Sequence, residues 1–231
     1  MSARPAATRR TAIAPAEVVG SVRHNAYVQF QRNLLAGRIR PGQLVSQREL
    51  VVMLEVSLGA LRELLPRLEA EGLLTVMPQR GIQITSIDLK MIRNAYQMRM
   101  ALEREAVIAA VHGAEDAELD AQIALHEHIL ADARRGVSDP ILQRAQDVDA
   151  GMHSFLIGST RNELLIQAYE INSIRVRLIN IDRMRLTPDV LPRAFADHLD
   201  ILRAILGRNE REAVAALERH IQDARNRAVA F

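Results

Sequence analysis

Residues Ser46–Leu68, SQRELVVMLEVSLGALRELLPRL, have the pattern of two short helices joined by a tight turn. In the first half, apolar residues recur at the spacing of one buried helical face, at Leu50, Val51 and Leu54. Glu55-Val56-Ser57 follows as a turn, and the Ser57 side chain can cap the second helix. That second helix would bury four leucines, Leu61, Leu64, Leu65 and Leu68.

Arginines lie on the polar side of the same stretch. Arg62 and Arg67 are on the exposed face of the second helix, and Arg48 is near the start of the first. In a helix-turn-helix these positions meet phosphates and base edges of DNA. An ordinary helical hairpin with solvated arginines has the same local pattern, so the flanking sequence must decide between the two.

The flanking sequence favours a winged helix-turn-helix. Residues 71–76 and 82–84 predict two short strands around a Pro/Gly turn, which form a wing. Residues 34–44 predict the end of a first helix, a Pro41-Gly42 turn and a short strand that can pair with the wing. The first helix itself is expected over 16–36.

This N-terminal half resembles the GntR family of bacterial transcription regulators. The matches follow the family's G-x-[LI]-x-P-G-x-x-L turn and its R-E-A-L-x-x-L-x-x-E-G-L helix, at Gly37, Ile39, Pro41, Gly42, Leu44, Leu50, Ser57, Leu61, Arg62, Glu63, Leu65, Leu68, Glu71, Gly72 and Leu73. The chain departs from the family at Leu58 and Gly59, where Arg and then a small or polar residue are usual. The resemblance implies binding to double-stranded operator DNA, with contacts from Arg48, Ser57, Arg62 and Arg80.

Composition narrows the possible functions. The chain has 231 residues, of which 48% are hydrophobic, so it can form one or two domains with a sizeable core. Aromatic residues make up 3% and Trp is absent, which disfavours stacking on single-stranded bases. The lack of cysteine excludes disulfides and thiolate metal sites. No apolar run approaches ~18 residues and no signal-peptide pattern occurs, so we expect a soluble, cytoplasmic chain that does not enter a membrane.

Charge is distributed unevenly along the chain. Residues 1–86 contain 11 Arg and 6 acidic residues, whereas residues 87–231 contain 19 basic and 22 acidic residues. A basic N-terminal half joined to a slightly acidic C-terminal half is the polarity expected of a DNA-binding domain joined to a regulatory domain.

These patterns predict a mainly α protein with three parts. Residues 1–15 are rich in Ala, Pro and Arg and lack apolar periodicity, so we expect a disordered tail; 16–86 form the DNA-binding domain. Ser86 or Asp88 can cap a new helix, and helical periodicity continues from there with few breaks. Residues 87–231 should therefore form an all-helical bundle of about six helices.

Candidate ligating residues are concentrated in this second half. Asp149 and His153 are four residues apart, which places them on the same face of a helix, one turn apart. His198 and His220 lie on either side of a predicted helical hairpin at 207–209, each about 15 Å from its turn and therefore at a similar level. Three imidazoles and one carboxylate can thus converge inside the bundle.

The second half resembles the FadR C-terminal domain, FCD, in the same positions. The family pattern is D-x-x-x-H-x-x-L-x-x-x-x-x-N-x-x-L, then H-x-x-I-x-x-A-I and a final His about 22 residues on. The matching residues here are Asp149, His153, Leu156, Asn162, Leu165, His198, Ile201, Ala204, Ile205 and His220. The resemblance implies that Asp149, His153, His198 and His220 bind a divalent metal such as Zn²⁺, Ni²⁺ or Mn²⁺, ions that suit imidazole and carboxylate ligands. The histidines outside the pattern, His24, His112, His126 and His128, are expected at the surface.

The resemblance also implies a small carboxylate as effector. Arg99 matches the R-x-x-x-E of the first FCD helix, and its fork of N–H donors beside a metal would bind a carboxylate. Asn172, Arg175 and Arg177 are further candidates, although a solvated charged face explains these two arginines equally well.

The sequence thus predicts a homodimeric, one-component transcription regulator with no enzymatic activity. Three other interpretations stay open. A metal sensor would use the ion itself as effector, and an architectural winged helix would have no ligand. A metal-dependent helical-bundle enzyme would need paired Glu-x-x-His or His-Glu-x-x-His motifs, which the sequence lacks.

Overall fold

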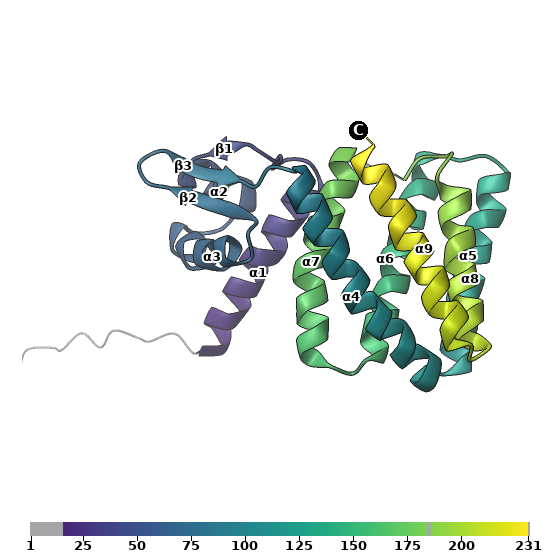
Figure 1. The fold of residues 1–231 in the computed structure, drawn as a ribbon. Helices are drawn as coiled ribbons and strands as arrows, with labels where there is room; N and C mark the ends of the chain where they lie inside the picture. Colours follow the sequence, from purple (N-terminus) through teal and green to yellow (C-terminus); the bar gives the residue numbers. More distant parts are fainter. Residues whose placement is uncertain (1–15, 184–185, 231) are drawn as a thin grey trace, which may run out of the picture. The chain divides into compact units, whose positions relative to one another are not determined.

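The computed structural model describes residues 16–183 and 186–230, which form two compact units divided between Thr85 and Ser86 (Figure 1). The predicted tail at 1–15 lies outside the described residues. Among the helices that the structure describes, none is long and apolar enough to cross a membrane.

The first unit has a small antiparallel sheet beside helices (Figure 1). Its elements are α1 (Ala16–Leu35), β1 (Leu44–Val45), α2 (Gln47–Leu54), α3 (Leu58–Ala70), β2 (Leu74–Met77) and β3 (Gly81–Ile84). The strand order is β1-β3-β2, with Leu44 opposite Gln83 and Leu74 opposite Ile84. The predicted winged helix-turn-helix, including the strand that pairs with the wing, is therefore confirmed.

Serine caps fix where α2 and α3 begin. The Ser46 side chain accepts a hydrogen bond from the Glu49 backbone N–H at 3.2 Å, and Glu49 accepts one from the Ser46 N–H at 2.7 Å. Ser57 caps α3 by accepting from the N–H of Ala60 at 3.1 Å, as predicted. Between the two helices, Glu55 takes a left-handed conformation with φ of 55°, which makes the turn tight.

The core of the first unit lies between its helices and sheet. The side chains that are 0% exposed include Phe30, Leu50, Leu54, Leu61, Leu68, Ile82 and Ile84. Gly81 permits the wing to approach β1, because a Cβ atom there would lie 2.7 Å from the carbonyl oxygen of Val45. A larger residue at this position would push β1 away from β3.

The second unit is all-helical, as predicted. Within its described residues the helices are α4 (Leu89–Gly113), α5 (Asp116–Arg134), α6 (Asp139–Ser159), α7 (Glu163–Arg183), α8 (Leu191–Leu206) and α9 (Glu210–Val229). Asp88 is the N-cap of α4 and accepts from the N–H of Met91 at 2.6 Å. α4 packs against α6, α7 and α9, while α8 packs against α5 and α9, so the helices enclose a shared interior (Figure 1).

Candidate functional site

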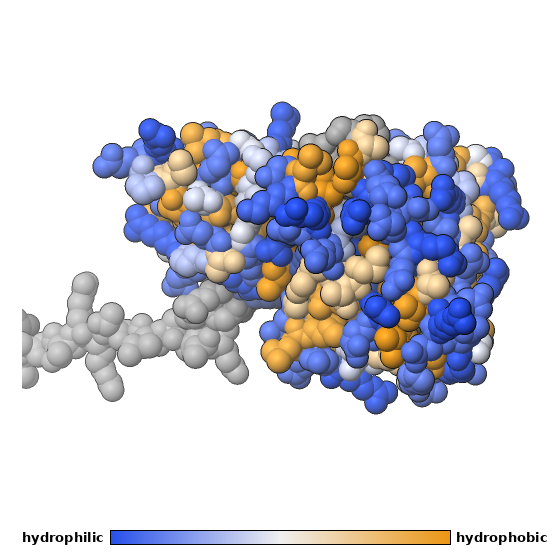
Figure 2. All heavy atoms as spheres, in the orientation of Figure 1, coloured by the Kyte–Doolittle hydropathy of each residue, from blue (hydrophilic) through white to orange (hydrophobic). Residues whose placement is uncertain are grey.

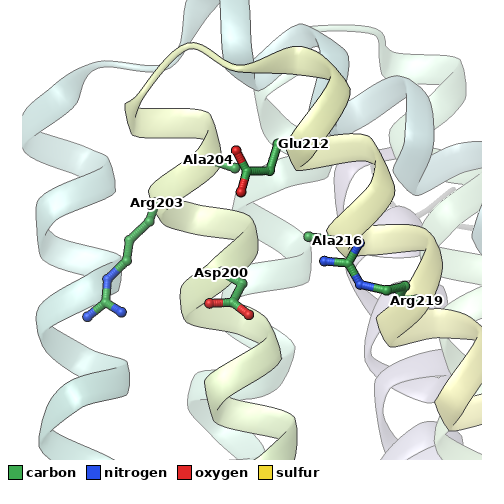
Figure 3. A pocket seen from close by; sticks show the side chains of 6 residues that line it. All are labelled: Asp200, Arg203, Ala204, Glu212, Ala216 and Arg219. Atoms are coloured by element: carbon green, nitrogen blue, oxygen red, sulfur yellow. The ribbon is translucent and has the colours of Figure 1, made fainter.

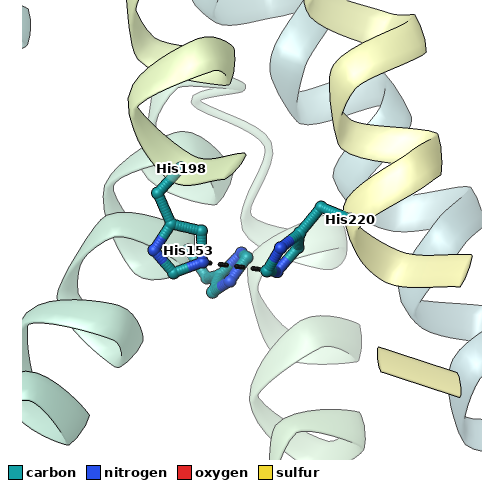
Figure 4. A group of neighbouring side chains, drawn as sticks. All are labelled: His153, His198 and His220. Atoms are coloured by element: carbon teal, nitrogen blue, oxygen red, sulfur yellow. Dashed lines mark hydrogen bonds between the residues drawn. The ribbon is translucent and has the colours of Figure 1, made fainter. Parts of the chain in front are cut away.

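Three histidines meet in the interior of the second unit (Figure 4). His153 comes from α6, His198 from α8 and His220 from α9, and all three are buried. One ring nitrogen of each lies within 4.8 Å of the other two, and the Nε2 atoms of His198 and His220 are 3.3 Å apart. The hairpin of α8 and α9 thus brings two residues separated by 22 positions to the same level.

Asp149 lies next to this cluster but is less enclosed. Its Oδ1 atom is 3.5 Å from Nε2 of His198, and its side chain is 36% exposed. It is not one of the three residues whose ligand atoms are all within 4.8 Å of one another. Asp149 precedes His153 by one helical turn on α6, so the two side chains lie on the same face of the helix. Because the Asp149 side chain is partly exposed, its carboxylate is at the edge of the cluster that is open to solvent.

Arg99 and Glu103 of α4 surround His153 on its other side. The Arg99 Nε donates to Glu103 Oε1 at 2.7 Å, and its terminal nitrogen donates to Nε2 of His153, also at 2.7 Å. Glu103 Oε2 is 2.8 Å from Nδ1 of the same ring. Because a guanidinium only donates, Nε2 of His153 must be the unprotonated nitrogen, and the proton is on Nδ1 facing Glu103.

Electrostatics keep Glu103 ionised although its side chain is 0% exposed. Burial alone would raise the pKa of this carboxyl, but the charge of Arg99 and the ring of His153 outweigh burial and hold the pKa at about 2. The site therefore has a permanent buried anion behind His153.

The chemistry of the donor set fits a divalent metal ion. Burial in the low-dielectric interior lowers the pKa of His198 and of His220, and it outweighs the carboxylate of Asp197, which acts in the opposite direction on His220, so both rings are neutral near pH 7. Neutral imidazole is the form that binds metals. Nδ1 of His220 is also 3.7 Å from a carboxylate oxygen of Asp197, and such outer carboxylates orient metal-binding histidines.

His126 corrects one prediction from the sequence. It was expected at the surface with His24, His112 and His128, which are indeed exposed, but the His126 side chain is 0% exposed. Its ring centroid is 5.2 Å from that of His198. The sequence contained a signal for this: His126 lies at helical spacing from the buried Leu119 and Ile129 on α5, whereas His128 lies on the opposite side.

The predicted effector residues lie in different environments. Arg99 is buried beside the histidines, as described above. Asn172 of α7 donates to the backbone oxygen of Ala95 at 2.9 Å, so its amide holds α7 to α4. Arg175 is half-buried on α7, and Arg177 is exposed. Sequence reasoning did not identify Tyr169 of α7, whose pKa is raised by burial and by the nearby charge of Glu103, which keeps its hydroxyl protonated as a donor.

The predicted DNA-contacting residues all lie at the surface of the first unit. Arg48 is on α2, Ser57 and Arg62 are at the start of α3, and Arg80 is in the turn between β2 and β3; all four are exposed. Arg67 has a different role. Its guanidinium carbon is 3.7 Å from the centroid of the Tyr27 ring, and its Nε donates to Glu71 at 2.9 Å, so it helps to hold α1 against α3.

A separate cavity of about 360 Å³ lies between α8 and α9 (Figure 3). Its lining residues are Asp200, Arg203, Ala204, Glu212, Ala216 and Arg219. Two acidic and two basic side chains give it no preference for one sign of charge, and it contains none of the three histidines. Because the histidine cluster also combines burial with converging donor atoms, it is the stronger candidate site.

Comparison with known proteins identifies both halves of the chain. Residues 23–84 match the family model described as bacterial regulatory proteins, gntR family, and residues 94–223 match the FCD domain model. A relative from Aminobacter aminovorans, the Nta operon transcriptional regulator, is 30% identical over 186 residues, which cover 79% of this chain and 83% of that protein. The HTH-type transcriptional repressor RspR of Escherichia coli is 26% identical over 206 residues, with 87% and 86% covered.

Solved structures have the same fold. E. coli McbR/YncC superposes with a TM-score of 0.68 at 18% identity, covering 89% of this chain and 94% of that one. A GntR-type regulator from Rhodococcus sp. RHA1 gives the same TM-score at 19% identity, covering 92% of this chain and 99% of that one.

Proposed function

Because the chain belongs to the GntR family of bacterial regulatory proteins and is a transcriptional regulator with a C-terminal FCD domain, we propose that a small carboxylate bound at a divalent-metal site controls its binding to operator DNA. We assign DNA binding to residues 16–86, and effector binding and homodimerisation to 87–231. The relatives and family models are regulators rather than enzymes, so no reaction is part of the proposal. A regulator of bacterial operons acts in the cytoplasm, where the DNA is.

The exposed arginines of the first unit support the DNA-binding assignment. α3 has the capped start and buried leucine face of a recognition helix, and Arg62 projects from its exposed side. Arg48 and Arg80 add cations on α2 and the wing, where contacts to phosphate position the helix in the groove. Repression is the proposed direction of control, by analogy with the relative that is named a repressor.

The buried histidine cluster is the observation that carries the metal proposal. His198 and His220 would hold the ion through Nε2, and His153 would join them through its own Nε2 once the ion displaces the hydrogen bond that Arg99 donates to that atom. Asp149 would add a carboxylate from the solvent-accessible edge. Zn²⁺, Ni²⁺ and Mn²⁺ all suit this set of ligands. A bound ion would supply a positive charge that attracts the carboxylate of the effector.

Arg99 is the proposed partner of the metal in holding the effector. Its guanidinium is close enough to His153 to donate to it, so it can also reach an acid that binds beside the ion. Asn172, Arg175 and the hydroxyl of Tyr169 are the further polar groups that we assign to the effector on α7. The effector would then contact α4 and α7 together with the metal-binding helices.

The homodimer is assigned to the second unit, where several apolar side chains are exposed, although those of α4 do not share one face. Leu89 and Met98 of α4 are 61% and 41% exposed, and Leu164 of α7 is 77% exposed. The helices α4 and α7 pack against each other through other residues. Orange patches also interrupt the polar surface in Figure 2. Burial of such side chains against a second copy would remove apolar area from water.

The proposed mechanism is a change in the spacing of two recognition helices. Effector binding at the ion and Arg99 would shift the helices of the second unit, and a dimer would transmit this shift to its two DNA-binding domains. Recognition helices that fit successive major grooves must be about 34 Å apart, so a small displacement changes operator affinity.

A thermal-melting screen tests this proposal. The chelator-treated protein is melted with Zn²⁺, Ni²⁺ or Mn²⁺ alone, and then with mono-, di- and tricarboxylates in the presence and absence of each metal. We expect one class of acid to raise the melting temperature only with metal, since a ligand at 100 times its dissociation constant adds about 2.7 kcal/mol. His198→Ala should abolish both shifts. An acid that stabilises the metal-free protein equally would contradict the metal-bound carboxylate.

A metal sensor is the second candidate. It is favoured by the ion pair of Arg99 with Glu103, which satisfies the guanidinium without any external acid. Stabilisation by one metal, combined with no response to any acid, would favour this candidate.

A further inference from the structure

We infer that His126 is a positioning residue of the proposed metal site, where its Nε2 accepts a hydrogen bond from the Nδ1–H of His198 and thereby directs Nε2 of His198 toward the ion. The inference rests on the proposed function, because it assigns His198 as a metal ligand. His126 comes from α5, a helix that contributes none of the proposed ligands.

The backbone fixes the tautomer of His126. Its Nδ1 is 2.7 Å from the backbone oxygen of Gln122, one turn earlier on α5. A carbonyl oxygen only accepts, so Nδ1 must carry the proton, and Nε2 of the neutral ring is left as an acceptor. Among the described residues, that buried Nε2 has no hydrogen-bond partner.

His198 has the complementary unpaired atom. Its Nε2 faces His220 and Asp149, at 3.3 and 3.5 Å, which leaves Nδ1 as the nitrogen that carries the proton when Nε2 binds a metal. That Nδ1 is buried, and the described part of the chain gives it no partner. The Nδ1 atoms of His153 and His220 also lack a well-aligned hydrogen bond, but each has a carboxylate oxygen nearby, from Glu103 at 2.8 Å and from Asp197 at 3.7 Å.

The two unpaired atoms are on adjacent rings. The centroids of His126 and His198 are 5.2 Å apart, with an interplanar angle of 80°. A ring nitrogen lies about 1.1 Å from its centroid, so rotation of the two rings can bring these nitrogens to about 3 Å, the length of a hydrogen bond that the structure itself does not yet contain. Phe195 packs beside both rings, with centroids at 5.0 and 5.4 Å, and offers neither a donor nor an acceptor.

Pairing would connect the ion to the backbone of α5. The order would be metal, His198, His126 and the Gln122 carbonyl, so that every polar atom of both rings is satisfied. A buried donor and a buried acceptor that stay unpaired both destabilise the fold, so the pairing is favoured. Outer partners of this kind orient the metal-binding ring, and their loss lowers metal affinity by about 10- to 100-fold.

Zinc affinity of the full chain tests the inference, measured by competition with a chelating dye. His126→Phe and His126→Leu remove the acceptor, whereas His126→Gln can place an amide oxygen near the position of Nε2. We expect Phe and Leu to weaken zinc binding by about 10- to 100-fold and Gln to keep it within about threefold. His128→Phe is the matched control, since it makes the same change on the exposed side of α5 and should leave zinc affinity unchanged.

Melting of each variant in chelator shows whether the metal-free fold is intact, and the use of two apolar variants covers the case in which one does not fold. Visible absorption of the Co²⁺-loaded proteins provides a second readout, because displacement of His198 alters the ligand field. Equal zinc affinity in all three His126 variants and the unaltered protein would overturn the inference, as would an equal loss in Gln, Phe and Leu. Absence of zinc binding in the unaltered protein would instead contradict the metal site itself.

Discussion

The carboxylate of Glu103 is fully buried, the least exposed acidic group among the residues that the structure describes. It forms an i,i+4 ion pair with Arg99 on α4, and the two side chains are 0% and 9% exposed. We expect Glu103→Gln to lower the free energy of unfolding by about 3 kcal/mol in the presence of chelator, because it leaves the Arg99 cation buried without its counter-ion. Denaturant unfolding of the two proteins measures this difference.

Glu218→Gln is the matched control, because its ion pair with Arg104 is exposed. The Arg104 and Glu218 side chains are 58% and 43% exposed, and their charged atoms are 3.6 Å apart. Such a pair contributes less than about 1 kcal/mol. Equal costs for the two substitutions would show that Glu103 is not the buried counter-ion of Arg99.

Tyr27 contributes to the stability of the first unit, and this contribution is lost at high pH. Burial, followed by the hydrogen bond to Glu71 and the charge of that residue, raises the pKa of Tyr27 to about 12. In the unfolded chain the pKa is about 10, so the stabilisation is complete below pH 10 and is lost as pH rises toward 12. Its full value is roughly 2 kcal/mol.

Unfolding of Tyr27→Phe as a function of pH isolates this contribution. The hydroxyl donates to Glu71 at 2.7 Å, so the variant should be less stable by about 1–2 kcal/mol at pH 8. The difference between the two proteins should shrink between pH 10 and pH 12. If the difference in free energy of unfolding stays constant between pH 10 and pH 12, the pKa of Tyr27 is not raised in the folded protein.

Single residues differ in how far the sequence can reveal their role. The spacing of Asp149, His153, His198 and His220 indicated a common level in a helical bundle, and the structure places the three histidines together. The spacing of His126 from Leu119 and Ile129 was a signal for its burial, but its place beside His198 depends on the packing of α5 against α8, which the sequence did not show. From the sequence, Glu103 was only the Glu of the R-x-x-x-E motif that begins at Arg99. Its contact with His153 could not be predicted, since it joins residues 50 positions apart on separate helices.

The elements of the DNA-binding half were predictable because their signals are local. Capping serines and leucine periodicity depend on residues within one or two turns, and α2 spans Gln47–Leu54 as expected. Pairing of β1 with β3 joins residues almost 40 positions apart, yet the Pro/Gly turns limited the alternatives. Arg67 was less predictable, since its contact with Tyr27 depends on how α1 packs against α3.

α3 is the element through which we expect operator DNA to be recognised. Arg62→Ala should weaken binding to an operator, selected from random duplexes, by about 1–3 kcal/mol if Arg62 contacts a base. Arg38→Ala removes an exposed cation from the turn after α1 and should change affinity little. Fluorescence anisotropy at one fixed salt concentration measures both. Equal losses would contradict the assignment of α3 as the recognition helix.

At the scale of the whole molecule, the proposed homodimer predicts the form of the operator. Two half-sites should lie with centres about 34 Å apart, one turn of DNA. Insertion of about five base pairs between them rotates one half-site to the opposite face, so we expect affinity to fall to that of a single half-site. Binding that tolerates this insertion would contradict a dimer with fixed spacing.

Joint control of DNA binding by a metal and a carboxylate is the proposed property of the full chain. Affinity of the full chain for its selected operator, measured for the metal-free, zinc-loaded and zinc-plus-acid protein with the acid found by melting, tests this proposal most directly. We expect operator affinity to change by at least about fivefold when zinc and acid are both present, and not to change in His198→Ala. Equal operator affinity in the metal-free, zinc-loaded and zinc-plus-acid protein would contradict control by the metal and the acid.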